Sequence, residues 1–311
     1  MLDLGIVIVN YNVCDLLRRC LETVFASSGD LQFRVWVVDN ASPDESVAMV
    51  RREFPQVAVI ANQENVGYPA ANNQGLQAMG VGEAGHVLPG APRYVLLLNP
   101  DTEVEPDTLG RLIAFMDEAD GVGVVGPKLL LPTGELDHAC RRGFPTPRAS
   151  FYYMTGLSRL FPRSSRFAQY DLKHLSVDQQ VDVDAVTGAF MLVRTAAIVE
   201  VGLLDERFWM YGEDLDWAKR IKDAGWRVVY NPVVKALHVK GRSSRQNPRA
   251  RIEFYRAMPI FYYKHYRAET PFWLHFFVLL GIALKGGRPL WSDIMAGEAI
   301  LERRSPHLLA P

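Results

Sequence analysis

Two aspartates stand in unusual settings in this 311-residue sequence, and their positions suggest complementary chemistry. Asp101 closes the apolar run 94–101, and Asp214 begins a helix-like stretch after the aromatic segment 208–211. A carboxylate at the end of a buried strand can bind a divalent cation that also contacts a phosphate. A carboxylate at a helix start can accept a proton from a hydroxyl group. We therefore interpret Asp101 as a metal ligand and Asp214 as a general base.

Both aspartates also have an ordinary interpretation. A single carboxylate after a strand often serves a turn or caps a helix. Acidic residues in a first helical turn, here Glu213, Asp214 and Asp216, cap free N–H groups and complement the helix dipole. The sequence around each residue leaves both interpretations open.

Further polar residues follow other predicted strands or begin a predicted helix. Asp39 either accepts a hydrogen bond from a nucleobase N–H or stabilises a turn. Asparagine is a poor residue within a helix, so Asn72 and Asn73 are interpreted as hydrogen-bonding residues. The set that we assign to binding is Asn10, Tyr11, Asn12, Asp39, Asn65, Gly67, Asn72 and Asn99.

His238 ends a predicted strand and opens a basic loop that includes Lys240 and Arg242. Between residues 235 and 256 there are seven lysines or arginines and one acid, Glu253. Such a run is often a solvated surface. Next to a histidine it can instead close over a diphosphate, with the imidazole as a second metal ligand.

The elements that must position these residues follow an alternating pattern. We predict strands at 4–9, 33–38, 57–60 and 94–98, and helices at 16–25, 69–79 and from Pro106 to before Gly121. Ser42, Pro43 and Glu45 predict a capping box that starts another helix. Strands that alternate with helices indicate a mostly parallel sheet covered on both faces, and ligands bind beyond its carboxyl strand ends.

The second half is less regular. We predict a strand at 185–193, a helix at 214–224, short strands at 226–230 and 233–239, and a helix at 249–266 interrupted by Pro259. Residues 145–175 are expected to be irregular. The apolar run 272–284 is shorter than the roughly 20 residues of a membrane-spanning helix. It is followed by Lys285 and Arg288, and predicts either a docked helix or one that lies in a membrane interface.

Composition excludes several classes. A net charge of −1 argues against a nucleic-acid-binding protein, and 49% hydrophobic with 22% charged residues is typical of a globular enzyme. Cys14, Cys20 and Cys140 have no paired or metal-like spacing and indicate reduced thiols. No signal-peptide pattern opens the chain. We expect a cytoplasmic protein, with peripheral contact at the inner face of the membrane as an added hypothesis.

Eight segments, in order, resemble the family 2 inverting nucleotide-sugar glycosyltransferases of GT-A fold, above all bacterial rhamnosyltransferase-like members. They are 7–12, 37–42, 65–73, 97–101, 187–190, 204–208, 211–216 and His238 with its basic loop.

The resemblance implies a GT-A (Rossmann-like) catalytic domain over 1–245, with a nucleotide-binding half at about 1–125 and an acceptor half at about 126–245. A helical extension would occupy 246–311. It implies that Asp39 contacts the base, that Asp101 and His238 hold Mg²⁺ or Mn²⁺ on the diphosphate, and that Asp214 is the catalytic base. The family's Asp-x-Asp motif appears here as Asn99-Pro-Asp101, without its first carboxylate.

For the donor the resemblance suggests dTDP-rhamnose first, with UDP-galactofuranose or UDP-N-acetylglucosamine as alternatives. The acceptor would be a glycan or lipid-linked saccharide in cell-surface polysaccharide synthesis, near Trp209, Tyr211 and Glu213. Nucleotidyltransferases, methyltransferases and dinucleotide oxidoreductases are disfavoured because no glycine-rich loop follows the first strand. A catalytically silent glycan-binding module remains the alternative from another class.

Overall fold

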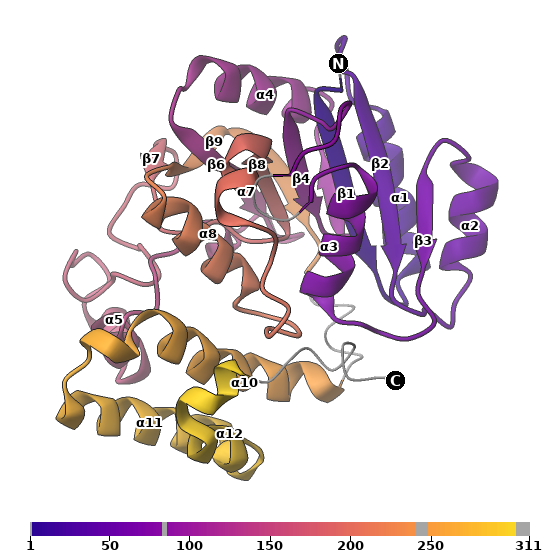
Figure 1. Cartoon of the computed structure of the whole chain (residues 1–311). Helices are drawn as coiled ribbons and strands as arrows, with labels where there is room; N and C mark the ends of the chain where they lie inside the picture. Colours follow the sequence, from indigo (N-terminus) through magenta and orange to yellow (C-terminus); the bar gives the residue numbers. More distant parts are fainter. Residues whose placement is uncertain (1, 83–85, 241–247, 303–311) are drawn as a thin grey trace.

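The computed structural model describes residues 2–82, 86–240 and 248–302, and within them nine strands form one sheet (Figure 1). The strand order is β3-β2-β1-β4-β8-β6-β9-β5, and β7 pairs with β9. The strands are β1 (Leu4–Asn10), β2 (Phe33–Asp39), β3 (Ala58–Ala61), β4 (Tyr94–Leu98), β5 (Thr102–Val104), β6 (Val122–Leu130), β7 (Val181–Asp182), β8 (Phe190–Arg194) and β9 (Arg227–His238).

The first half of the sheet is parallel. Strand β1 lies between β2 and β4, and β3 pairs with the outer side of β2. Every residue of β1 and β4 is buried, as expected for strands covered on both faces. Strand order reverses at β1, because β2 and β3 continue to one side and β4 lies on the other. Asn10, Asp39 and Asn99 therefore meet at the carboxyl ends beside this switch point.

The second half of the sheet is mixed. Strand β8 runs antiparallel between β4 and β6, whereas β6 and β9 are parallel to each other. The short β5 pairs antiparallel with the end of β9, so that Thr102 lies opposite His238. This pairing brings His238 next to Asp101, which precedes Thr102 in the chain.

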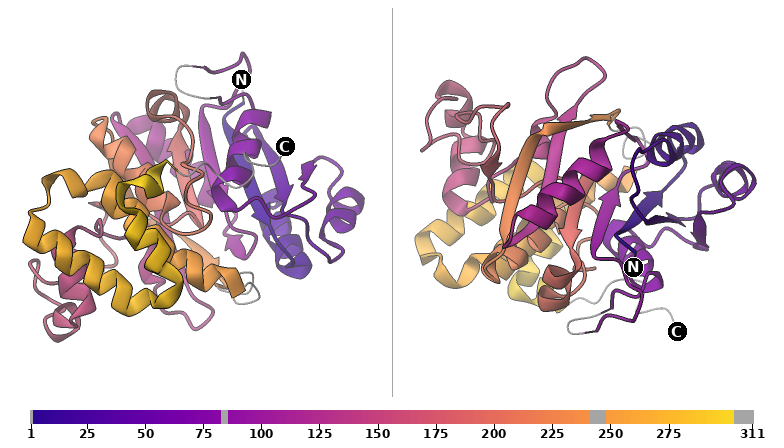
Figure 2. Two further views of the ribbon diagram at one scale, coloured as in Figure 1. Left: turned by 60° about the horizontal axis from the view of Figure 1, so that its bottom comes forward. Right: turned by 90° about the horizontal axis from the view of Figure 1, so that it is seen from above.

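Helices cover both faces of the sheet (Figure 2). Helix α3 (Tyr68–Ala78) packs on the face of β1 that carries Gly5 and Val7, where a Cβ at Gly5 would collide with Met79. The Tyr94 hydroxyl, on the opposite face, donates to Asp117 of α4 (Thr108–Glu118). The other covering helices are α1 (Cys14–Phe25), α2 (Ser46–Glu53), α7 (Thr195–Val201) and α8 (Glu213–Asp223).

The predicted capping box at Ser42 is wrong. Helix α2 begins at Ser46, and the Ser42 side chain instead donates to Asp39 and accepts from the backbone N–H of Asn12. A nearby buried carboxylate is a stronger partner for this hydroxyl than a helix N–H group. Ser42 thus joins the ends of β1 and β2 and does not start a helix.

Four predictions for the second half also need correction. Strand β8 begins at Phe190, so Thr187 and Gly188 lie in the preceding loop. The two short strands predicted at 226–230 and 233–239 form the single strand β9. The segment 145–175 is not wholly irregular, since it contains α5 (Pro147–Met154) and α6 (Leu157–Leu160). Helix α10 (Pro248–His265) continues through Pro259, because its buried face around Phe261 packs on the core.

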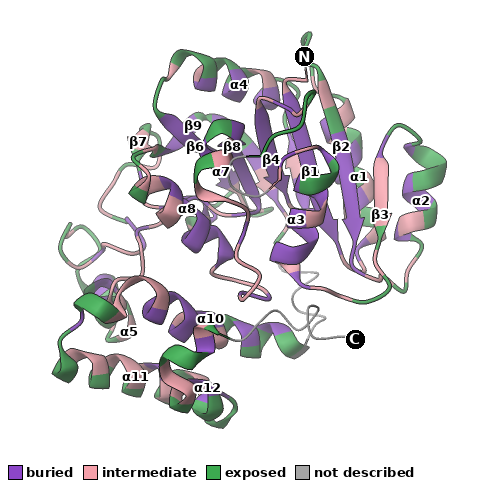
Figure 3. Cartoon of the chain, in the orientation of Figure 1, coloured by how far each residue is buried: buried purple, intermediate pink, exposed green. Residues whose placement is uncertain are grey.

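The C-terminal helices α10, α11 (Phe272–Gly286) and α12 (Trp291–Ala296) gather on one side of the molecule, beside α5 (Figure 1). Asp216 of α8 is fully buried and accepts from His265 and pairs with Lys264, both in α10. The sheet and α8 are largely buried, whereas α11 and α12 are mostly exposed or intermediate (Figure 3). The division into 1–245 and 246–311 stays a prediction. None of the described helices is both long enough and apolar enough to cross a bilayer.

Candidate active site

Asn10 and Asp39 form a buried polar cluster at the ends of β1 and β2. The Asn10 amide donates to Asp39 at 2.8 Å, and the Ser42 backbone N–H donates to the other Asp39 oxygen at 2.8 Å. Asn12, with a positive φ of 56°, turns the chain beside them, and Tyr11 is half-buried at the same turn. Each oxygen of Asp39 therefore accepts a hydrogen bond, and these bonds fix the orientation of the carboxylate at the ends of β1 and β2.

Asp101 and His238 lie together, as the sequence predicts, and a third residue orients them. The His238 Nε2 atom is 3.4 Å from an oxygen of Asp101, and its Nδ1 atom is 2.8 Å from Asp137. Asp137 also accepts from Lys240 at 2.6 Å. Lys240 is thus an ion-pair partner of Asp137, while Arg242 lies outside the described residues.

The charges in this cluster are strongly coupled. Burial alone would raise the pKa of Asp137, but the His238 and Lys240 hydrogen bonds hold it well below its usual range. Burial would lower the pKa of His238, whereas Asp101 and Asp137 raise it to about 9. His238 therefore carries a proton between two carboxylates at neutral pH.

This cluster has donors that suit a hard divalent cation. Asp101 would offer a carboxylate oxygen, and His238 would offer its Nε2 atom once the proton there is displaced by the cation. The two atoms are 3.4 Å apart, and Asp137 holds the ring through Nδ1, as in carboxylate–histidine–metal arrangements. Two protein ligands are typical where substrate phosphates complete the shell. Within 2–82, 86–240 and 248–302 no group of three or more metal-binding side chains occurs, so phosphate oxygens would have to supply the rest.

Asp214 lies in α8 but does not cap it. The N-cap residue of α8 is Gly212, whose φ is 82° and which has no side chain to accept a capping hydrogen bond. Asp214 instead forms a short ion pair with Arg142, and accepts from the backbone N–H groups of Gly188 at 3.1 Å and Leu215 at 2.8 Å. Asp214 is therefore not the N-cap residue of α8, although one of its oxygens accepts from the first-turn N–H of Leu215, and its other oxygen faces Arg142 and the loop before β8.

Glu213, the neighbouring carboxyl, is in a different electrostatic state. It is only 6% exposed, and its Oε2 atom has no hydrogen-bond partner within the described part of the chain. Burial, and next the charge of Asp214, raise its pKa from 4.5 to about 8. The two adjacent carboxyls thus differ in their surroundings: Asp214 is paired with a guanidinium, whereas the burial of Glu213 favours its protonated form.

Tyr68 connects the two carboxylate clusters. Its hydroxyl donates to Asn99 at 3.1 Å or to the Gly188 carbonyl at 2.9 Å, and Gly188 also donates to Asp214. Burial raises the pKa of Tyr68, which keeps the hydroxyl protonated as a donor. A continuous chain of contacts therefore links the Asn99-Pro-Asp101 turn to Asp214.

The segment before α3 packs on the loop before α8. Gly67 has a φ of 91°, and a Cβ there would lie 2.7 Å from Trp209. Asn65 accepts from the Gly67 N–H and so holds this turn. Trp209 is buried under the guanidinium of Arg249, 4.1 Å from the ring centroid, and Tyr211 is in edge contact with Phe254 of α10.

The two helical asparagines differ. Asn73 bonds to the backbone of Leu204 in both directions, which confirms its hydrogen-bonding role. Asn72 donates to the Tyr68 carbonyl one turn earlier, and its buried Oδ1 atom has no partner within the described residues. Only Asn72 therefore retains a polar atom that could still accept a hydrogen bond.

Three residues that complete the site were missed at the sequence level: Tyr68, Asp137 and Arg142. Asp137 and Arg142 lie in the segment after β6, which has no regular periodicity. The signal available there was Arg142, one of two consecutive arginines in a stretch without acids from 138 to 170. Arg142 is partly buried, and Asp214 is its carboxylate partner.

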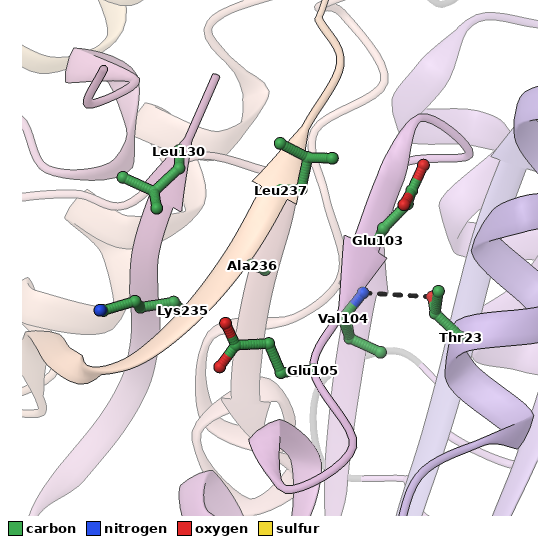
Figure 4. A pocket seen from close by; sticks show the side chains of 8 residues that line it. All are labelled: Thr23, Glu103, Val104, Glu105, Leu130, Lys235, Ala236 and Leu237. Atoms are coloured by element: carbon green, nitrogen blue, oxygen red, sulfur yellow. Dashed lines mark hydrogen bonds between the residues drawn. The ribbon is translucent and has the colours of Figure 1, made fainter. Parts of the chain in front are cut away.

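A shallow hollow of about 220 Å³ lies beside β5 and β9 and holds none of these residues. Figure 4 shows Glu103, Glu105 and Lys235 around it, with the Val104 N–H donating to Thr23. Side chains alternate along a strand, so its lining residue Leu237 and the adjacent His238 point to opposite faces. The hollow is thus on the other face of the sheet, and we assign it no role in catalysis.

Carboxylates at and beside the carboxyl ends of parallel strands, next to a switch point, are the arrangement found in nucleotide-sugar-dependent transferases of GT-A fold. The profile of glycosyl transferase family 2 matches residues 5–160, and the chain belongs to this family. The family and the fold expected from the sequence are both confirmed.

Curated relatives include rhamnosyltransferases. The chain is 28% identical to N-acetylglucosaminyl-diphospho-decaprenol L-rhamnosyltransferase of Mycobacterium tuberculosis, over 79% of this chain and 78% of that protein. It is 25% identical to rhamnosyltransferase WbbL of Escherichia coli K12, over 77% of this chain and 84% of that protein.

Solved structures share the fold. The mannosyltransferase PcManGT from Pyrobaculum calidifontis, in complex with GDP-Man and Mn²⁺, matches with a TM-score of 0.54 and 17% identity, over 97% of this chain and 81% of that one. GalNAc-T7 with UDP, GalNAc and Mn²⁺ matches with a TM-score of 0.57 and 15% identity, over 87% of this chain and 52% of that one.

Proposed function

We propose that this glycosyltransferase moves a sugar, first of all rhamnose from dTDP-rhamnose, to a lipid-linked glycan acceptor with inversion at the anomeric carbon. The observation that carries the proposal is the contact chain from Asn99, two residues before Asp101, through Tyr68 and Gly188 to Asp214, because it supports a diphosphate site and a base that lie near each other. The named activity of the rhamnosyltransferase relatives supports the donor. UDP-sugars are the alternative donors.

In the proposed reaction Asp214 is the general base. The acceptor hydroxyl oxygen attacks the anomeric carbon while the bond to the diphosphate breaks, and the electron pair leaves with the nucleoside diphosphate. The hydroxyl proton passes to Asp214. Arg142 supports this role because its charge holds Asp214 in one orientation, and protonated Glu213 is suited to donate to an acceptor oxygen.

Asp101 and His238 would hold Mg²⁺ or Mn²⁺ against the diphosphate. When bound, the metal supplies positive charge beside the departing phosphates. Asp137 holds the His238 ring at 2.8 Å and fixes which nitrogen faces Asp101. Asn10, Asp39 and the turn at Asn65 are proposed to contact the nucleoside, because they lie at or after the carboxyl ends of β1, β2 and β3.

The experiment that tests the base is Asp214→Asn. We expect the rate of sugar transfer from dTDP-rhamnose to fall by roughly 10²–10⁴-fold, while the affinity for the donor is retained. The measurements are the initial transfer rate, donor binding by calorimetry and the melting temperature. A thermal-shift screen of dTDP- and UDP-sugars with Mg²⁺ or Mn²⁺ identifies the donor beforehand, since ligands that bind the native state raise its melting temperature.

The matched control is Asp223→Asn in the same helix, an exposed residue that pairs with Lys219. We expect near-normal transfer from this variant. An Asp214→Asn enzyme that transfers sugar at the normal rate would remove Asp214 as the base. Loss of transfer together with donor binding and a large fall in melting temperature would instead assign Asp214 to a structural ion pair.

A further inference from the structure

An exposed apolar stripe runs along α11. Its six members are between 41% and 82% exposed: Phe272, Trp273, Phe276, Phe277, Leu280 and Leu284. At 100° per residue they fall within an arc of about 140° of the helix. Ile282 and His275 lie on the opposite side, where Ile282 is buried and His275 bonds to the Tyr262 hydroxyl. The stripe is thus the outward face of a helix that is already docked by its inner face.

A cationic segment lies beside this stripe. Residues 138–170 contain no aspartate or glutamate, and four of their arginines are exposed: Arg148, Arg159, Arg163 and Arg166. Phe151, Leu160 and Phe161 are exposed among them. The arginines therefore have no carboxylate partner within their own segment.

The stripe and the cationic segment adjoin. Helices α5 and α11 are in contact, and a Cβ at Gly281 would lie 3.1 Å from the Met154 methyl group. Gly281 is about 40° around the helix from Phe277, so α5 packs at the edge of the stripe. Figures 1 and 2 both show α5 next to the C-terminal helices. The segment that carries the arginines therefore begins next to the helix that carries the exposed aromatic residues.

We infer that this surface, the α11 stripe with residues 148–166, binds the face of an anionic phospholipid bilayer. Aromatic and leucine side chains enter the boundary between headgroups and acyl chains, while guanidinium groups bind phosphates. A neutral apolar partner would explain the stripe but not the adjacent arginines. A bilayer with negative headgroups matches both.

This surface is linked to the proposed active site through the chain. Arg142, which pairs with Asp214, lies five residues before α5 begins. An acceptor held in a membrane under α5 and α11 would therefore approach from the side of the base. Membrane contact would assist sugar transfer only if the acceptor is lipid-linked, and in that respect the inference rests on the proposed function.

The test is flotation of the full chain with vesicles of phosphatidylglycerol and phosphatidylcholine, compared with phosphatidylcholine alone. We expect binding to the anionic vesicles that weakens as salt rises. Phe276→Ser with Phe277→Ser should weaken binding tenfold or more. Arg159→Ser with Arg163→Ser should weaken it roughly 25-fold, at about fivefold for each charge. All four side chains are exposed, so these variants should fold.

The control is Arg51→Ser with Arg111→Ser, which removes two exposed arginines from α2 and α4. We expect unchanged vesicle binding. No flotation with anionic vesicles, or equal loss in the control, overturns the inference. A concentration-dependent dimer that the phenylalanine variant dissociates, without vesicle binding, would assign the stripe to self-association instead. Flotation needs no sugar substrate, so its outcome is independent of whether transfer activity is found.

Discussion

Glu213→Gln is expected to stabilise the protein, and to do so only above the pH at which a free glutamate ionises. Glu213 is buried beside Asp214, which raises its pKa from 4.5 to about 8. Below pH 4.5 both the folded and the unfolded chain carry the proton. As pH rises through 4.5 the unfolded chain ionises, while the folded chain holds its proton until about pH 8. Stability is therefore lost across that window.

The size of the effect follows from the shift. Each pKa unit corresponds to 1.36 kcal/mol, so the difference between 4.5 and about 8 sets an upper value of about 5 kcal/mol. Glutamine cannot ionise and does not suffer this loss. We compare the unfolding free energy of Glu213→Gln with that of the wild type at each pH. This difference should be roughly 2 to 5 kcal/mol more favourable to the variant at pH 8.5 than at pH 4.5.

The assay is urea unfolding of both proteins at the two pH values, with equal slopes as a check that the unfolded states are comparable. In the difference between the unfolding free energies of variant and wild type, the contributions of titrating groups that do not contact Glu213 cancel. Glu22→Gln, an exposed change on α1, is the control and should show the same difference at both pH values. An equally flat result for Glu213→Gln would refute the protonated, buried state of this carboxyl.

Three further outcomes are expected. Transfer should require Mg²⁺ or Mn²⁺, and Asp101→Ala should weaken nucleoside diphosphate binding only when metal is present; full activity in excess EDTA would contradict this. Asp137→Asn, which removes the charge behind His238, should weaken metal-dependent diphosphate binding by roughly 10- to 100-fold in calorimetry, and unchanged binding would count against the orienting role. Asp216→Asn should lower the unfolding free energy by about 3 kcal/mol in urea titrations, because it removes a fully buried carboxylate that pairs with Arg220, Lys264 and His265, and an unchanged free energy would show that these ion pairs do not stabilise the fold.

The nucleotide half of the fold is readable from the sequence because its strands are continuous apolar runs. Strands β1 to β4 fall within one residue of their predicted positions, since buried parallel strands carry no alternation that could be misread. The start of β8 was misplaced because Thr187 and Gly188 extend the same apolar run into a loop. The break predicted at Pro259 does not occur. Proline has no N–H to donate within the helix, but the packing of its buried neighbours maintains α10 without that one backbone hydrogen bond.

The candidate site was predictable where its residues sit next to a recognisable element. Asp101 lies in the turn between β4 and β5 and His238 ends β9, and the pairing of β5 with β9 brings the two residues together. Asp137 and Arg142 were not predictable, because their partners lie 101 and 72 residues away and no local pattern marks the contact. Long-range polar pairing is decided by tertiary packing, and only the burial of an arginine hints at it.

The ion pairs between α8 and α10 have a consequence for the construction of chimaeras. Asp216, two residues after the proposed base, holds Lys264 and His265 at 2.6 and 2.7 Å. A hybrid enzyme joined near residue 245 would take α8 from one parent and α10 from the other, and would set unrelated side chains against a fully buried carboxylate. Exchange of acceptor specificity between family members should therefore move both helices together, with the junction placed after His265, where the chain passes through 267–271 before α11 begins.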